Sequence, residues 1–182
     1  MASRPEKLTG GCLCGSIRYT ITITPETEWP PTHVRYLLGT YHNHMISVSN
    51  IPVQNGTCQC TMCRKFTGSL FQSSNHFPTT SISPPLSSFP KYTTYTSSDK
   101  AYRGFCSKCG SSLTFNFLDD DKTEVCLGSV DEEILRGKWG TQLCKAKEHI
   151  WCENAVRGVT DTLGGVMWTK ARGSEKFGVE GD

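Results

Sequence analysis

The chain has 182 residues, a formal net charge of +2, and 36% hydrophobic and 20% charged residues. This length and composition predict one globular domain with a real core. The small net charge argues against nucleic acid binding, and no apolar run reaches the length of a membrane span. Residues 1–7 lack the apolar segment of a secretory signal, so we expect a cytoplasmic, reducing location in which cysteines serve as metal ligands. Five disulfides in a secreted protein are the disfavoured alternative.

Short alternating segments predict a mainly β fold with few short helices. Residues 16–24 alternate strictly between apolar and polar side chains, which is typical of a half-buried strand. Further strand candidates, rich in β-branched or aromatic residues, are 92–96, 101–105, 113–117, 124–130 and 149–151. Only residues 131–136 look helical.

Three regions depart from this rhythm. Residues 25–57 carry little periodicity and read as a loop. Residues 66–90 contain no Asp, Glu, Lys or Arg, and they form either a loop or the wall of a neutral pocket. The polar, Gly-containing end from residue 172 onward is expected to be flexible.

The cysteines are the most informative feature. Seven of the ten fall into three tight clusters. These are Cys12 and Cys14; Cys58, Cys60 and Cys63; and Cys106 and Cys109. Zinc takes four ligands in a closed structural site, whereas a site with three protein ligands leaves a position for water or substrate. Seven clustered thiols therefore divide into one site with four cysteine ligands and one site with three.

The first and third clusters each contribute two ligands next to strand candidates. A glycine follows each pair, at Gly15 and Gly110, and can adopt the left-handed conformation of a zinc-binding turn. Pairing the two clusters predicts a structural zinc bound by four cysteines, which joins parts of the chain that are distant in sequence.

The middle cluster allows two interpretations. One is a second closed zinc site whose fourth ligand is Cys126, Cys144, Cys152 or a histidine. The other is an open three-cysteine site that offers zinc's fourth position to a thiolate, carbonyl or alkoxide. Arg64 and Lys65 follow the last cysteine and would attract an anionic substrate, although solvent exposure alone explains such a pair.

Three motifs carry a resemblance to a known family. Residues 11–19, 58–68 and 103–113, together with 149–151, closely resemble the glutathione-dependent formaldehyde-activating enzyme family, which also includes centromere protein V. The resemblance implies a zinc-containing fold of the β-tent type with two zinc sites. It implies a structural zinc on Cys12, Cys14, Cys106 and Cys109, and a catalytic zinc on Cys58, Cys60 and Cys63.

The resemblance also implies an activity. The founding reaction of the family is the condensation of glutathione with formaldehyde, so we expect a carbon–sulfur lyase with a small-molecule substrate and glutathione as a possible co-substrate. Candidates for substrate binding are Arg64, Lys65 and Arg103. The alternatives are a lyase or dehydratase that tailors a less polar natural product, and a non-enzymatic zinc module like centromere protein V. The basic arm that nucleic acid binding would need is missing before Gly11.

The resemblance sets the expected domain boundaries. Residues 10–170 form the zinc domain, between flexible segments at 1–9 and 171–182. The spacing between Cys14 and Cys58 is longer than in compact members, which predicts an insertion at about residues 29–56. His149 lies in a matching segment, but a histidine in a strand is more often structural than catalytic.

Overall fold

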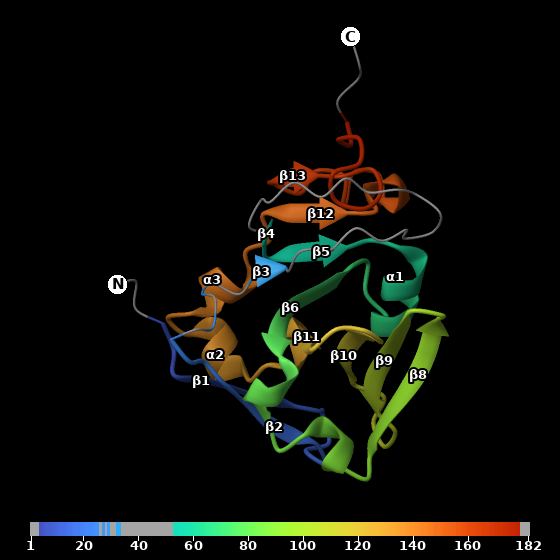
Figure 1. The fold of residues 1–182 in the computed structure, drawn as a ribbon. Helices are drawn as coiled ribbons and strands as arrows, with labels where there is room; N and C mark the ends of the chain where they lie inside the picture. Colours follow the sequence, from blue (N-terminus) through green and yellow to red (C-terminus); the bar gives the residue numbers. More distant parts are fainter. Residues whose placement is uncertain (1–3, 26, 28, 30–31, 34–52, 179–182) are drawn as a thin grey trace. The chain divides into compact units, whose positions relative to one another are not determined.

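A computed structural model describes residues 4–25, 27, 29, 32–33 and 53–178 of the chain. Its contacts divide the chain into two compact units. Figure 1 shows the helices and strands, coloured from the N-terminus to the C-terminus. Unit 1 comprises Met1–Pro31 and Ser74–Lys145, and unit 2 comprises Thr32–Ser73 and Ala146–Asp182. Each unit combines two separated stretches of sequence, so no single boundary along the chain marks the division.

Unit 1 contains a small antiparallel sheet in the order β1-β2-β7. Its strands are β1 (Lys7–Gly11), β2 (Arg18–Thr22) and β7 (Ile82–Ser83). The alternation predicted for residues 16–24 is confirmed, because Ile17, Tyr19, Ile21 and Ile23 are all at most 5% exposed. These side chains supply one side of the hydrophobic core.

The other strands of unit 1 form a longer antiparallel arrangement in the order β6-β11-β10-β9-β8. They are β6 (Gln72–Pro78, in unit 1 from Ser74), β11 (Lys122–Cys126), β10 (Ser112–Phe117), β9 (Ala101–Cys106) and β8 (Tyr92–Ser98). Phe77, Leu113 and Val125 join the core from these strands. Cys12 and Cys106 belong to the same core, which places one candidate metal site at its margin.

Unit 2 is built around three short parallel strands in the order β13-β12-β5. These are β5 (Gly56–Cys58), β12 (Glu148–Ile150) and β13 (Val166–Met167). A two-stranded antiparallel pair, β3 (Thr32–His33) and β4 (Val53–Gln54), also belongs to this unit. Helix α1 (Thr61–Thr67) follows β5 directly.

The mainly β fold predicted from the sequence is confirmed. In the described part of the chain, the α-helices are α1 and the five-residue α2 (Glu132–Arg136) and α3 (Gly140–Cys144). The remaining helical turns are 3₁₀ segments at Thr79–Ser81, Leu86–Ser88, Leu127–Ser129 and Cys152–Asn154. No helix of the described residues is long and apolar enough to cross a membrane.

Several local predictions differ from the structure. Helix α2 was expected, but α1 and α3 were not, because such short helices lack a full amphipathic repeat. The strand predicted at 124–130 ends at Cys126, where the chain enters a 3₁₀ turn. The uncharged stretch 66–90, read as a loop or pocket wall, contains β6 and β7. Most of the predicted insertion at 29–56 lies outside the described residues.

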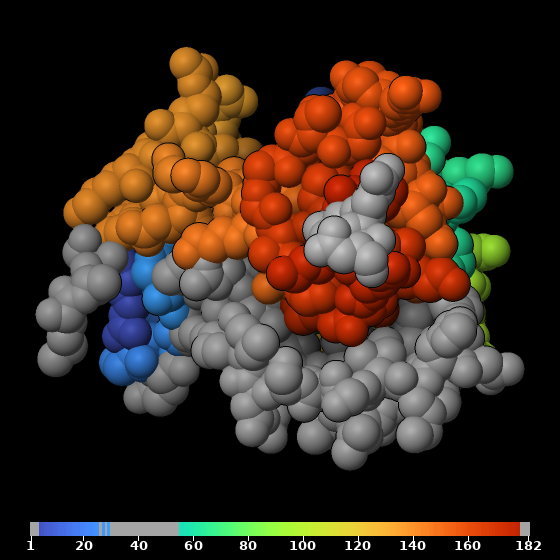
Figure 2. Space-filling model, turned by 90° about the horizontal axis from the view of Figure 1, so that it is seen from above, coloured from blue at the N-terminus to red at the C-terminus, as the bar shows by residue number. Residues whose placement is uncertain are grey.

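The structure also describes chain near both ends of the zinc domain predicted from the sequence. Strand β1 begins at Lys7 and pairs along its length with β2. At the other end, Arg172 donates to Glu148 at 2.5 Å, and the Phe177 N–H donates to the Met167 carbonyl at 2.9 Å. Arg172 and Phe177 therefore contact β12 and β13 of unit 2. Figure 2 shows the red C-terminal segment at the surface.

Candidate metal centres

The structure groups four cysteines in unit 1. Cys12 and Cys14 lie in the turn between β1 and β2, while Cys106 ends β9 and Cys109 lies in the turn that leads to β10. All four sulfur atoms lie within 4.8 Å of one another. The Cys12 and Cys14 sulfurs are 3.6 Å apart, and those of Cys14 and Cys106 are 3.8 Å apart.

These separations fit a tetrahedral metal centre. Four sulfurs bound to zinc at about 2.3 Å would lie about 3.8 Å from one another at the corners of a tetrahedron. The thiol donor set is also one that zinc prefers. The group formed by Cys12, Cys14, Cys106 and Cys109 therefore has both the chemistry and the spacing of a structural zinc site.

The two turns adopt this geometry for local reasons. Gly15 and Gly110 have φ angles of 72° and 75°, the left-handed region that glycine adopts without penalty. Their N–H groups donate to the carbonyls of Cys12 and Cys106 at 3.0 and 2.8 Å, which closes each turn. The Ile17 N–H donates to the Cys12 sulfur at 3.3 Å, as expected for a cysteine held as a ligand.

Two thiols of the four-cysteine group have pKa values that are shifted in opposite directions. The Ser111 hydroxyl, 3.3 Å from the Cys109 sulfur, lowers the pKa of Cys109 to about 5 by stabilising its thiolate. Burial raises the pKa of Cys12 to about 11. The thiolate form is therefore favoured at Cys109 and disfavoured at the buried Cys12, where a bound cation would offset the cost of burying the charge.

A second group of three cysteines lies in unit 2. Cys58 ends β5, Cys60 is the N-cap of α1, and Cys63 lies buried in the first turn of that helix. The Cys63 N–H donates to the Cys60 sulfur at 3.4 Å, so the thiol takes the role of a capping side chain. The three sulfur atoms lie within 4.8 Å of one another.

The three-cysteine group has no fourth ligand among the described residues. No other histidine, cysteine, aspartate or glutamate in that part of the chain joins it. The alternatives named from the sequence lie elsewhere: Cys126 ends β11 in unit 1, Cys144 ends α3, and the Cys152 sulfur contacts the Gln59 amide at 3.6 Å. Within the described chain, the group is compatible with an open metal position.

The three cysteines outside the two groups differ in burial. Cys126 and Cys152 are buried, whereas Cys144, the last residue of the short helix α3, is exposed.

Electrostatics favour a bound cation at the three-cysteine group. Hydrogen bonds with the Cys60 and Cys63 thiols raise the pKa of Cys58 well above its usual range. Three neighbouring thiolates repel one another unless a positive charge lies between them. The donor set and the close spacing both fit zinc, which binds thiolates and compensates their charge.

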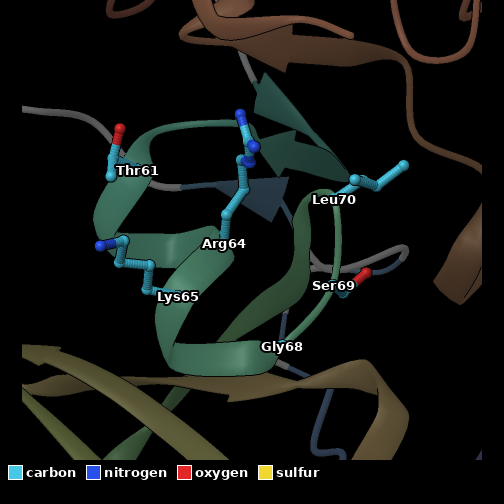
Figure 3. Close-up of a pocket in the computed structure, with 6 residues that line it drawn as sticks. All are labelled: Thr61, Arg64, Lys65, Gly68, Ser69 and Leu70. Carbon is cyan, nitrogen blue, oxygen red and sulfur yellow. The ribbon is translucent and has the colours of Figure 1, made fainter.

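A cavity of about 480 Å³ opens on the same helix (Figure 3). Thr61, Arg64 and Lys65 of α1 line it, and Gly68, Ser69 and Leu70 complete the lining. The Arg64 guanidinium donates to the Asn154 carbonyl at 3.1 Å, which holds the side chain in place. Two of the three candidate substrate-binding cations, Arg64 and Lys65, therefore line one cavity.

Arg103 is not among the residues that line this cavity. It lies in β9 of unit 1, is only 3% exposed, and stacks its guanidinium 4.8 Å from the centre of the Phe115 ring. A cation–π contact of this kind stabilises a buried guanidinium. Of the uncharged stretch 66–90, only the first residues, at 68–70, reach the cavity.

His149 occupies a structural position. Its Nε2 lies 3.0 Å from the Gly164 carbonyl, to which it must donate, so its Nδ1 accepts from the Thr57 hydroxyl at 2.7 Å. Both ring nitrogens are used and the side chain is 3% exposed. This agrees with the structural interpretation made from the sequence.

The cysteine groups lie in a chain that matches a known protein family. The family model described as glutathione-dependent formaldehyde-activating enzyme matches residues 43–154, more than half of the chain. The chain belongs to this family. The match includes the three-cysteine group together with Cys106 and Cys109, whereas Cys12 and Cys14 precede it. A comparison with curated proteins found no match.

Proposed function

We propose that this family member is a zinc-dependent carbon–sulfur lyase that handles thiol–aldehyde adducts of the S-hydroxymethylglutathione type. The observation that carries the proposal is the three-cysteine group, which finds no fourth protein ligand among the described residues. A closed four-ligand group on the same chain supports a division of labour, with one structural and one catalytic zinc.

Zinc bound by Cys58, Cys60 and Cys63 would supply a position for the thiolate sulfur or the aldehyde oxygen. Three thiolates bring more negative charge than the ion's two positive charges, which weakens any tendency to generate hydroxide. The cysteines therefore favour a centre that positions a substrate. In the reaction, a bond forms between the thiol sulfur and the aldehyde carbon, and the thiol proton ends on the aldehyde oxygen. No oxidant or reductant is needed.

The cavity on α1 supports an anionic thiol as substrate. Arg64 and Lys65 provide two positive charges, and Thr61 and Ser69 add hydroxyl groups, while Leu70 is the one large apolar side chain in the lining. Carboxylates form strong charge-assisted hydrogen bonds with such groups. Glutathione, with two carboxylates, fits this lining better than an apolar natural product does.

The direct test is exchange NMR with ¹³C-formaldehyde and glutathione. Protein that carries two zinc ions per chain is expected to accelerate formation and breakdown of the adduct over the buffer reaction. Protein treated with a chelator to remove zinc is the comparison, and restored zinc should restore the rate. Equal exchange in buffer and with the two-zinc protein would contradict the proposed activity.

Lys65→Met tests the role of the cavity. Lys65 is exposed and lines the cavity, so loss of its charge should weaken binding of the thiol without changing the metal ligands. We expect KM for glutathione to rise about tenfold at low salt, with kcat nearly unchanged, because one charge-assisted contact is lost. Saturation kinetics at two ionic strengths measure this.

Lys91→Met is the matched control, since Lys91 is an exposed lysine of unit 1 outside the cavity lining. Its KM should equal that of the wild type. Indistinguishable KM values for all three proteins would show that Lys65 does not bind the substrate.

A further inference from the structure

Gln59 stands between two of the cysteines of the three-cysteine group. It is the one residue between the end of β5 at Cys58 and the N-cap of α1 at Cys60. Its side chain is completely buried. The backbone N–H of Gln59 donates to the Ile150 carbonyl at 3.0 Å, which extends the pairing of β5 with β12 by one residue. Gln59 is therefore the residue at which the chain leaves β5 and turns toward α1.

Thr160 satisfies the buried amide of Gln59. The Gln59 Nε2 donates to the Thr160 carbonyl at 3.2 Å, and the Thr160 hydroxyl donates to Gln59 Oε1 at 2.7 Å. The same hydroxyl accepts from the Val156 N–H at 2.9 Å. A polar network of this kind, closed and away from water, holds its members in one arrangement. Gln59 is thus fixed to the loop that contains Val156 and Thr160.

The loop that follows β12, from Trp151 to Thr160, contacts helix α1 and the turn that contains Gln59. Trp151 has a φ of 60°, the one non-glycine residue with a positive φ in the described chain. Its N–H donates to the Lys170 carbonyl at 2.8 Å, and its carbonyl accepts from the Asn154 N–H at 3.1 Å. Asn154 in turn accepts from Arg64 of α1 at 3.1 Å. Residues with strained backbone of this kind persist where the surroundings over-determine them.

We infer that Gln59 and Thr160 are positioning residues for the three-cysteine metal centre. Their contact holds the turn between Cys58 and Cys60 so that both sulfurs face the same point before a metal binds. This inference rests on the metal site of the proposed function. Groups that hydrogen-bond a metal ligand typically change metal affinity by about 10 to 100-fold when they are lost, and we expect a similar range for Gln59, which acts on the two ligands through the backbone that joins them.

The test measures zinc affinity at both centres of one chain. Gln59→Met removes the amide at similar side-chain length, and Thr160→Val removes the hydroxyl at similar volume. Equilibrium competition with a chromophoric chelator should resolve two zinc ions in the wild type, and the ion lost in Cys60→Ser identifies the three-cysteine centre. We expect its dissociation constant to rise about 10 to 100-fold in Gln59→Met and about tenfold in Thr160→Val. The four-cysteine centre serves as an internal reference and should not change.

Thr123→Val is the matched control. Thr123 is as buried as Thr160, at 2% exposed, and its hydroxyl also has two partners, Thr79 and Asn116. This variant should leave both zinc affinities unchanged. Co²⁺ in place of zinc adds a second readout, because a displaced sulfur shifts the ligand-field bands of the three-cysteine centre in Gln59→Met and Thr160→Val alone.

The outcomes separate the two proposals. Wild-type protein that binds zinc only at the four-cysteine centre would overturn the proposed function and this inference with it. Two zinc ions in the wild type, with affinities within twofold in Thr160→Val and in Gln59→Met, would overturn the positioning role and leave the proposed function standing. If Gln59→Met does not fold, the zinc affinity of the three-cysteine centre in Thr160→Val alone tests the positioning role.

Discussion

Replacement of Cys60 by serine is expected to abolish the acceleration of glutathione–formaldehyde exchange and to remove one zinc ion per chain. Cys60 supplies one of three sulfurs and also caps α1, accepting from the Cys63 N–H. A serine hydroxyl still caps a helix but is a far poorer zinc ligand than a thiolate. The variant should therefore keep its helix and lose its metal. Metal analysis and exchange NMR on the same sample measure both effects.

Cys144→Ser is the control for this experiment. Cys144 is an exposed cysteine outside both groups, so its replacement makes the same chemical change without touching a ligand. It should retain two zinc ions and the full rate. A Cys60→Ser protein that keeps the wild-type rate would show that the chemistry does not take place at the three-cysteine centre.

Replacement of Cys106 by serine is expected to destabilise the fold. Cys106 is fully buried, and its sulfur lies 3.8 Å from that of Cys14, which is 92 residues away in sequence. Metal that joins such distant segments contributes directly to folding, with binding free energies of about 10 to 16 kcal/mol in small zinc domains. Loss of one ligand should lower the free energy of unfolding by more than about 3 kcal/mol, a large part of ordinary domain stability. Thermal and urea unfolding, with zinc content measured in parallel, would record the loss.

Cys126→Ser separates the loss of a metal ligand from the burial of a hydroxyl. Cys126 is also a buried cysteine of unit 1, at 5% exposed, but it belongs to neither group. We expect this variant to cost about 1 kcal/mol, as a buried polar group does when it is poorly paired. If Cys106→Ser costs no more than Cys126→Ser, the four-cysteine group does not hold a structural metal.

The clustering of the cysteines could be predicted because it depends on short spacings. Thiols one or two residues apart can face one point, and a glycine follows two of the clusters, at Gly15 and Gly110. The pairing of Cys12 and Cys14 with Cys106 and Cys109 was predicted from the ligand count of zinc, because Cys14 and Cys106 lie 92 residues apart in sequence. The structure brings together the same four and the same three sulfurs. The strand at residues 16–24 could be predicted for a similar reason, since a two-residue alternation is a local pattern that survives in the buried face of β2.

Other features depend on contacts that no local pattern reveals. Arg103 resembles Arg64 as a candidate cation next to a cysteine motif, yet it is buried against Phe115 while Arg64 lines a cavity. Helix α1 was missed because its seven residues are stabilised by a cysteine cap and by Gly68, which ends it in the left-handed conformation. The sequence likewise contains no signal that Gln59, between two ligands, pairs with Thr160.

The sequence by itself therefore determined the mainly β class, the two cysteine groups and the family. Only the tertiary structure decided that the chain forms two units, which cations share a cavity, and how the cysteine turn in unit 2 is held. The physical reason is distance along the chain. Strand alternation and the ligand spacing within each cysteine cluster are set within a few residues. The pairing of Gln59 with Thr160, in contrast, joins residues that are 101 positions apart and forms only when the chain has folded.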